Sequence, residues 1–84
     1  MNIKLADQAK ADISHWNRVA PALTAKIERL LANIMQTPYS GLGKPEPLRY
    51  ELTGCWSRRI NHEHRLVYKV DGDTLYVLSC RFHY

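Results

Sequence analysis

CWSRRINHEHRLVYKVDGDTLYVLSCRF, which occupies residues 55–82, decides the fold of this chain. Asp71 and Gly72 form an adjacent pair in the second half of the stretch, which is a strong signal for a β-hairpin. The asparagine, histidine and glutamate of NHEH predict an earlier turn. These turn signals separate three runs rich in β-branched and aromatic residues, each of which predicts a strand: 55–61, 64–70 and 74–82.

The N-terminal half has a helical period instead. A short strand is expected over residues 2–6, and Asp7 is expected to cap a first helix that runs to about Arg18. A second helix is expected from Pro21, and it must end before Pro38. The predicted order is strand, two helices and four strands, of which the first lies before residue 55 and the other three are the runs above. The fold class is therefore α+β, with an N-terminal strand and with two helices packed on one face of an antiparallel sheet.

The two-residue period of a strand assigns side chains to the two faces of that sheet. In 64–70, Arg65 falls opposite the more apolar set, which contains Leu66 and Tyr68. In the last strand the more apolar set is Tyr76, Leu78, Cys80 and Phe82, which leaves Leu75, Val77, Ser79, Arg81 and His83 on the other face. We therefore expect Arg65 and His83 on one open surface.

Length and composition limit the class of protein. A chain of 84 residues cannot bury two cores, so one domain over residues 1–84 is expected. The sequence is 45% hydrophobic and 24% charged, as in ordinary soluble proteins, and no apolar run approaches the ~20 residues of a membrane span. The first ten residues lack the apolar stretch of a secretory signal. A cytoplasmic protein without membrane association is expected.

Net charge and cysteine content exclude fewer classes of protein. The formal net charge of +4 permits a polyanionic partner such as nucleic acid, but it is also ordinary for a soluble small domain. Cys55 and Cys80 have no C-x-x-C spacing, so neither a disulfide framework nor a thiolate zinc site is indicated. No metal and no cofactor are expected.

One candidate for chemistry is the glutamate of KPEPLR, residues 44–49. Pro45 has a fixed φ, and Glu46 precedes Pro47 and is held in an extended backbone, so the segment aims a carboxylate. Taken alone, such a triplet is more often a stiff connector with a solvated glutamate.

A second candidate is the arginine group of residues 55–65. Arg58, Arg59 and Arg65 carry planar forks that match phosphate oxygens. Nearby aromatic rings could stack on unpaired bases: Tyr50, Trp56, Tyr68 and Tyr84. The competing interpretation is structural, with Trp56 as a core anchor and Tyr68 packed inward.

The third candidate is His83, because imidazole exchanges protons near neutral pH. RNA cleavage needs a base for the 2′-hydroxyl proton, positive charge at the phosphate and an acid for the departing 5′-oxygen. Glu46, Arg65 and His83 could fill these roles in that order without a metal. By spacing alone the set is a weak signal, because the chain contains several other histidines, arginines and acids.

The segment TPYSGLGKPEPLRYELTGCWSRRINHEHRLVYKV and the terminal CRFHY closely resemble the Txe/YoeB family of toxins, a branch of the RelE superfamily of bacterial toxin-antitoxin pairs. GKPEPL, WSRRI, EHRLVY and an ending of aromatic, His and Tyr together form a specific signature. The resemblance implies a RelE/ParE-like fold and a ribosome-dependent endoribonuclease that cuts mRNA in the ribosomal A site.

The resemblance also implies roles for individual residues and partners. Glu46, Arg65 and His83 would be the base, the phosphate stabiliser and the acid, while Arg49, Arg59 and Tyr84 would belong to the substrate pocket. A cognate antitoxin would block this site, and related toxins often form homodimers. Arg49 stands where lysine is expected, Cys55 replaces an aromatic residue, and the first helix lacks several acidic and aromatic residues of relatives, so dimer and antitoxin contacts could differ.

Two other functions compete with the nuclease. One is a non-enzymatic toxin on the same scaffold that inhibits a protein target such as DNA gyrase, although such relatives lack the glutamate, arginine and histidine set. The other is a defective relative that is retained only as a binding partner.

Overall fold

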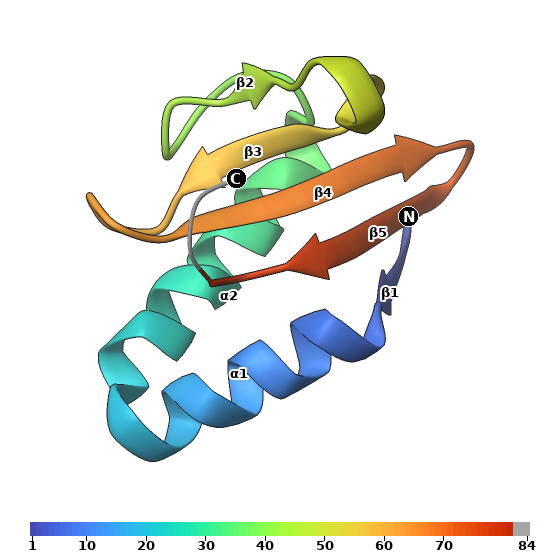
Figure 1. The fold of residues 1–84 in the computed structure, drawn as a ribbon. Coiled ribbons are helices and arrows are strands. Elements are labelled where there is room, and N and C mark those ends of the chain that lie inside the picture. The colour runs from blue at the N-terminus through green and yellow to red at the C-terminus, as the bar shows by residue number, and fades with distance from the viewer. Residues whose placement is uncertain (82–84) are drawn as a thin grey trace.

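A computed structural model describes residues 1–81 and gives the order of elements in Figure 1. The order confirms the sequence prediction, with a short 3₁₀ helix, η1, added before the last three long strands. The elements are β1 (Asn2–Leu5), α1 (Asp7–Val19), α2 (Pro21–Gln36), β2 (Glu46–Pro47), η1 (Tyr50–Leu52), β3 (Trp56–Arg59), β4 (Arg65–Asp71) and β5 (Thr74–Ser79).

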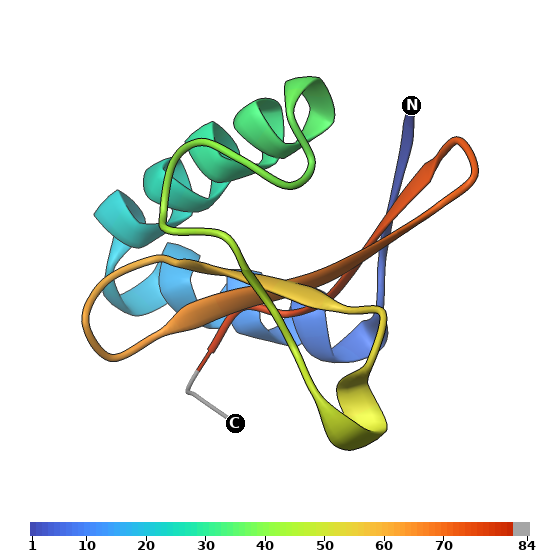
Figure 2. The ribbon, with the colours of Figure 1, turned by 90° about the horizontal axis from the view of Figure 1, so that it is seen from above.

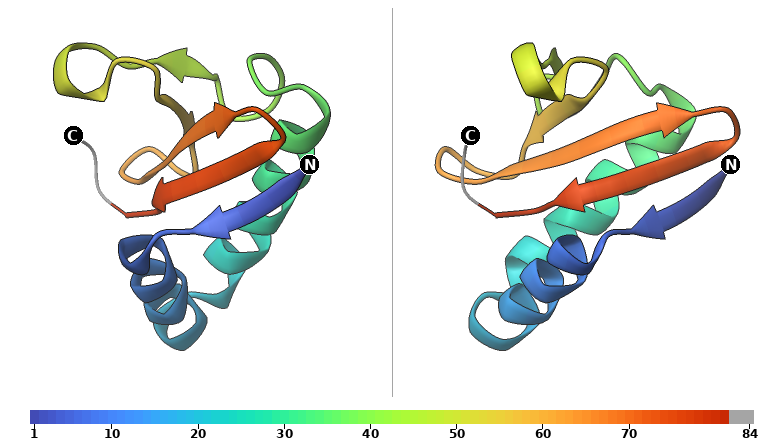
Figure 3. Two further views of the ribbon diagram at one scale, coloured as in Figure 1. Left: turned by 90° about the vertical axis from the view of Figure 1, so that its right-hand side faces the viewer. Right: turned by 45° about the vertical axis from the view of Figure 1, so that its right-hand side comes forward.

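The five strands form one sheet in the order β1-β5-β4-β3-β2. The last four strands are antiparallel to one another, whereas β1 pairs with β5 in parallel, so the sheet is mixed. The expected α+β class is confirmed. In Figure 3, β1 lies along the outer side of β5 with its arrow in the same direction, and the chain leaves β1 directly into α1.

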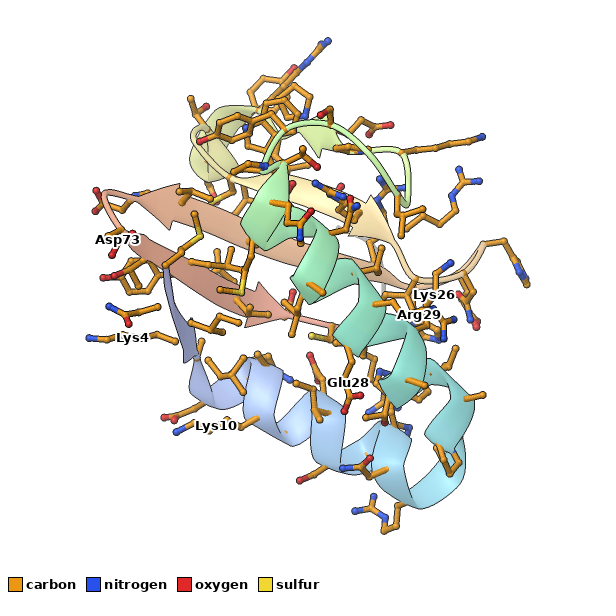
Figure 4. All side chains as sticks on the ribbon, turned by 180° about the vertical axis from the view of Figure 1, so that it is seen from behind. Lys4, Lys10, Lys26, Glu28, Arg29 and Asp73 are labelled. Atoms are coloured by element: carbon orange, nitrogen blue, oxygen red, sulfur yellow. The ribbon has the colours of Figure 1, made fainter. Side chains whose placement is uncertain are left out.

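Both helices cover the same face of the sheet, as Figures 2 and 4 show. Their apolar stripes pack on the sheet because residues three and four apart share one side of a helix. The core between the layers consists of Ala9, Trp16, Ile27, Leu30, Ile34, Ile60, Leu66, Tyr68, Leu75, Val77 and Cys80. No helix within residues 1–81 is long and apolar enough to span a membrane.

The helix ends follow local signals. Pro21 occupies the first turn of α2, where its missing N–H costs no hydrogen bond. Gln36 ends α2 just before the residue that precedes Pro38. Asp7 is the first residue of α1 rather than its cap, and its charge favours the positive end of the helix dipole.

The predicted faces are right for β4 but wrong for the first half of β5. Tyr68 pairs with Val77, whereas Val67 pairs with Ser79, so Leu78 is one extra residue in β5. This bulge reverses the alternation. Leu75 and Val77 therefore lie in the core, as Cys80 does after the bulge, while Ser79 joins Val67 on the opposite face. Phe82 lies outside the described residues.

Candidate active site

Glu46 lies on the sheet face opposite the helices. The strand register places Glu46 beside Ser57, Ser57 beside Val67, and Val67 beside Ser79. Paired residues point to the same side of a sheet, so these four residues form a row across the face that the helices leave open. Glu46 is exposed at the β2 end of the row.

Arg65 lies on this same face, two residues before Val67 in β4. Its Nε donates a hydrogen bond of 2.9 Å to Oγ of Ser57, which is fully buried. A longer contact of 3.4 Å joins its guanidinium to the carbonyl oxygen of Lys44. Because Ser57 stands opposite Glu46, it lies between the predicted base and the predicted phosphate stabiliser. The structure thus brings Glu46 and Arg65 together.

Arg59 is the β3 partner of Arg65 and is exposed. Two guanidinium-bearing residues therefore stand side by side next to the middle of the row, two positions along β3 and β4 from Ser57 and Val67, and they make this part of the face positive. The backbone N–H of Arg59 donates to the carbonyl of Gly43, so β3 also holds the chain that leads to Glu46. An anion placed on this face would meet both arginines.

The Pro-Glu-Pro segment forms β2, and Arg49 follows it in an extended conformation. Glu46, Pro47, Leu48 and Arg49 line a concave pocket of about 420 Å³. Arg49 is exposed, so its charge can reach a ligand in this pocket. Arg49 and Glu46 thus line the same pocket from one short segment.

Arg58 does not belong to the open face, contrary to its grouping with the phosphate-gripping arginines. Its side chain is 0% exposed. The guanidinium donates hydrogen bonds to Tyr68 Oη and Asn33 Oδ1 and to the backbone carbonyls of Thr37, Ser40 and Leu42. It therefore fastens the loop between α2 and β2 to the inside of the molecule.

The candidate stacking residues also differ in how far they are exposed. Tyr68 is buried, its hydroxyl donates to the carbonyl of Pro38, and burial raises the pKa of that hydroxyl. Trp56 is half-buried against the core, with its ring 4.8 Å from the ring of Tyr39. The structural interpretation holds for both, and Tyr50 alone of the described candidates is widely exposed, at 88%.

His83 and Tyr84 lie outside the described residues. The described chain ends at Arg81. This is two residues after Ser79, which is both the last residue of β5 and its member of the row. Within residues 1–81, no group of three or more His, Cys, Asp or Glu side chains is arranged to hold a metal ion. Cys55 and Cys80 are both buried and free.

The sequence profile described as "YoeB-like toxin of bacterial type II toxin-antitoxin system" matches residues 5–84. This chain belongs to the YoeB-like toxin family. The Toxin YoeB of Escherichia coli K12 is 42% identical over 84 residues, which is all of both chains. The Toxin YoeB of a Synechocystis strain is 53% identical and is aligned over all of this chain and 98% of its own length.

Solved structures of YoeB-like toxins agree with this membership. A YoeB/ParE toxin from Agrobacterium tumefaciens superposes with a TM-score of 0.97 at 44% identity, and all of both chains is covered. The YoeB dimer from Staphylococcus aureus gives 0.94 at 44% identity over all of this chain and 98% of that one. The sequence resemblance is thus confirmed, and a role as the toxin of a toxin-antitoxin pair follows from family membership.

The candidate site contains one residue that sequence reasoning missed. Ser57 was not a candidate, although alternation along β3 places it on the face of Arg59. Only the pairing of β3 with both β2 and β4 shows that it lies between Glu46 and Arg65.

Proposed function

We propose that this YoeB-like toxin is a ribosome-dependent endoribonuclease that cleaves mRNA in the ribosomal A site and so stops translation. The observation that supports this most is the placement of Glu46 and Arg65 on one open face, with Ser57 between them. A carboxylate and a held guanidinium at adjacent positions suit a reaction that removes a proton beside a phosphate.

In the proposed reaction, the Glu46 carboxylate accepts the proton of a ribose 2′-hydroxyl. The 2′-oxygen then attacks the adjacent phosphorus, and Arg65 stabilises the negative charge that develops on the pentacovalent phosphate. His83 donates a proton to the departing 5′-oxygen. The products are a 2′,3′-cyclic phosphate and a 5′-hydroxyl, and neither a metal nor a cofactor takes part.

The remaining predicted residues would bind the RNA. Arg59 and Arg49 flank Arg65 and Glu46 on the open side of the molecule, where they can contact flanking phosphates. Tyr84 is proposed to complete this pocket. Because so small a face offers few contacts to RNA, the ribosome would supply most of the alignment of the message.

The proposed partners follow from relatives. The Staphylococcus aureus relative has been solved as a dimer and as a YoeB-YefM complex. We extend both to this chain: a cognate antitoxin covers the face of Glu46 and Arg65, and a homodimer forms in solution. A protein that acts on translating ribosomes would work in the cytoplasm as one domain of residues 1–84.

Mapping new RNA 5′ ends after induced expression tests the proposal. The wild-type protein is expected to produce 5′-hydroxyl ends at a fixed phase within codons. Glu46→Gln should lower the cleavage rate on purified ribosomes by ~10²- to 10⁴-fold, because the amide cannot accept the proton. Arg65→Gln should lower it by a similar factor because the charge on the phosphate loses its partner.

Glu28→Gln and Arg29→Gln are matched controls. Both residues are exposed on α2, on the helical side of the molecule shown in Figure 4. They should cleave at the wild-type rate. Growth arrest with intact mRNA and damaged DNA would overturn the nuclease and support a gyrase-directed toxin, and unaltered cleavage by Glu46→Gln would remove the proposed base.

A further inference from the structure

Both backbone polar groups of Cys80 are bound by side chains of α1. The N–H of Cys80 donates a hydrogen bond of 2.9 Å to Oδ2 of Asp12. The carbonyl of Cys80 accepts one of 2.9 Å from Nε1 of Trp16. All three residues are buried, with Trp16 only 6% exposed. These two hydrogen bonds, called the pin below, therefore hold the backbone of Cys80 to α1.

The pin lies directly after the last paired residue of the sheet. β5 ends at Ser79, so Cys80 is the first residue whose backbone no longer belongs to the strand. Asp12 and Trp16 are four residues apart in α1 and so project from the same side of the helix. Asp12 is itself fixed by Gln8, whose side-chain amide donates to Oδ1 at 2.8 Å. Figure 3 shows α1 running beneath the end of β5.

Trp16 also contacts the segment that carries Arg65. Its ring meets the ring of His64 edge-on at a centroid distance of 4.7 Å, and His64 directly precedes Arg65. The Arg81 guanidinium lies 5.8 Å from the centre of the same indole. One buried side chain therefore touches the start of β4 and the exit of β5, which are distant in sequence.

The pin fixes the start of the segment that carries the proposed acid. His83 follows Cys80 by only three positions in the sequence. We propose that Asp12 and Trp16 are positioning residues that fix residue 80 so that the C-terminal segment places the imidazole of His83 at the scissile phosphate. This inference rests on the proposed function, since it acts through the acid of that reaction.

Trp16→Phe tests the inference, because it removes the N–H donor while it keeps an aromatic ring. Misplacement of a reacting group by about 1 Å can cost ~10²-fold, so we expect kcat on ribosomes to fall by ~10- to 100-fold with KM within about twofold. In a His83→Ala background the same change should cause no further loss, because the group that it positions is gone. Trp56→Phe, the same change at a tryptophan packed against Tyr39, is the control and should stay within about twofold of its parent in both backgrounds.

A purely structural role gives a different result. If Trp16→Phe lowered cleavage by the same factor with and without His83, or left it unchanged, the positioning role would be wrong. If Trp16→Phe does not fold, Asp12→Asn replaces it, since it keeps the shape but gives Cys80 a neutral acceptor. A loss of cleavage with His83 present and no further loss without it are then expected. A different result would count against the proposed function itself: His83→Ala alone would cleave as fast as the wild-type protein.

Discussion

Arg65 is hydrogen-bonded to Ser57, whose backbone faces Glu46 across the β2–β3 pair. The serine thereby sets the direction of the guanidinium relative to the carboxylate. Ser57→Ala removes a bond worth about 1 kcal/mol, so we expect kcat for mRNA cleavage to fall roughly fivefold. Ser79→Ala, the same change further along the row, should cleave like the wild type. Equal rates for the two variants would mean that Ser57 does not orient Arg65.

The neighbouring arginines Arg58 and Arg59 should differ in how much the same substitution changes stability. Arg58→Lys replaces a buried guanidinium, which donates hydrogen bonds to several acceptors, with a compact ammonium. We expect a loss of about 2–4 kcal/mol in the free energy of unfolding. The melting temperature should fall by about 10–20 °C. Arg59→Lys changes an exposed side chain and should shift stability by less than about 0.5 kcal/mol. Thermal and urea unfolding of both variants measure the difference.

The thiol of Cys80 should make stability sensitive to alkaline pH. Burial, with a smaller effect from the Asp12 charge, raises the pKa of Cys80 from 9.0 to about 12. The unfolded chain loses this proton near pH 9 while the folded chain retains it, so the contribution is complete below pH 9 and is lost as pH rises towards 12. Between pH 8 and pH 10 the wild type should lose about 1.4 kcal/mol more than Cys80→Ala, measured by urea unfolding under reducing conditions. Parallel pH profiles for the two proteins would contradict this.

Tyr50 has a backbone conformation that suits another residue. Its φ is +59°, in the left-handed region that is unfavourable for a bulky side chain, and the ring is almost fully exposed. Tyr50→Asn should stabilise the fold by about 0.5–1 kcal/mol, because asparagine tolerates this region and little packing is lost. Tyr39→Asn is the comparison and should destabilise, since that ring packs on Trp56. Urea unfolding of both variants gives the two signs.

Much of the fold could be predicted because its signals are local. The helical spacing of Leu30 and Ile34 and the Asp71-Gly72 pair need no knowledge of distant chain segments. The parallel position of β1 could not be predicted in this way, because it depends on how α1 packs back on the sheet. The faces of β5 were assigned wrongly because alternation assumes a regular strand, and the extra residue at Leu78 reverses it.

The site was predictable only in part. The prolines around Glu46 indicated an aimed carboxylate, and alternation placed Arg65 on the correct face. The sequence could not distinguish Arg58 from Arg59, since burial of Arg58 depends on a loop that folds over it from the other side. The role of His83 remains a prediction.

Pro45 and Pro47 have a consequence for how this protein can be inhibited. Among the described strands β2 forms one border of the sheet, and of residues 45–47 only Glu46 has an amide hydrogen. An edge strand with so few backbone N–H donors pairs poorly with an added strand. We therefore expect a polypeptide that blocks Glu46 to lie across the open surface and to shield it with side chains, and not to extend the sheet at β2.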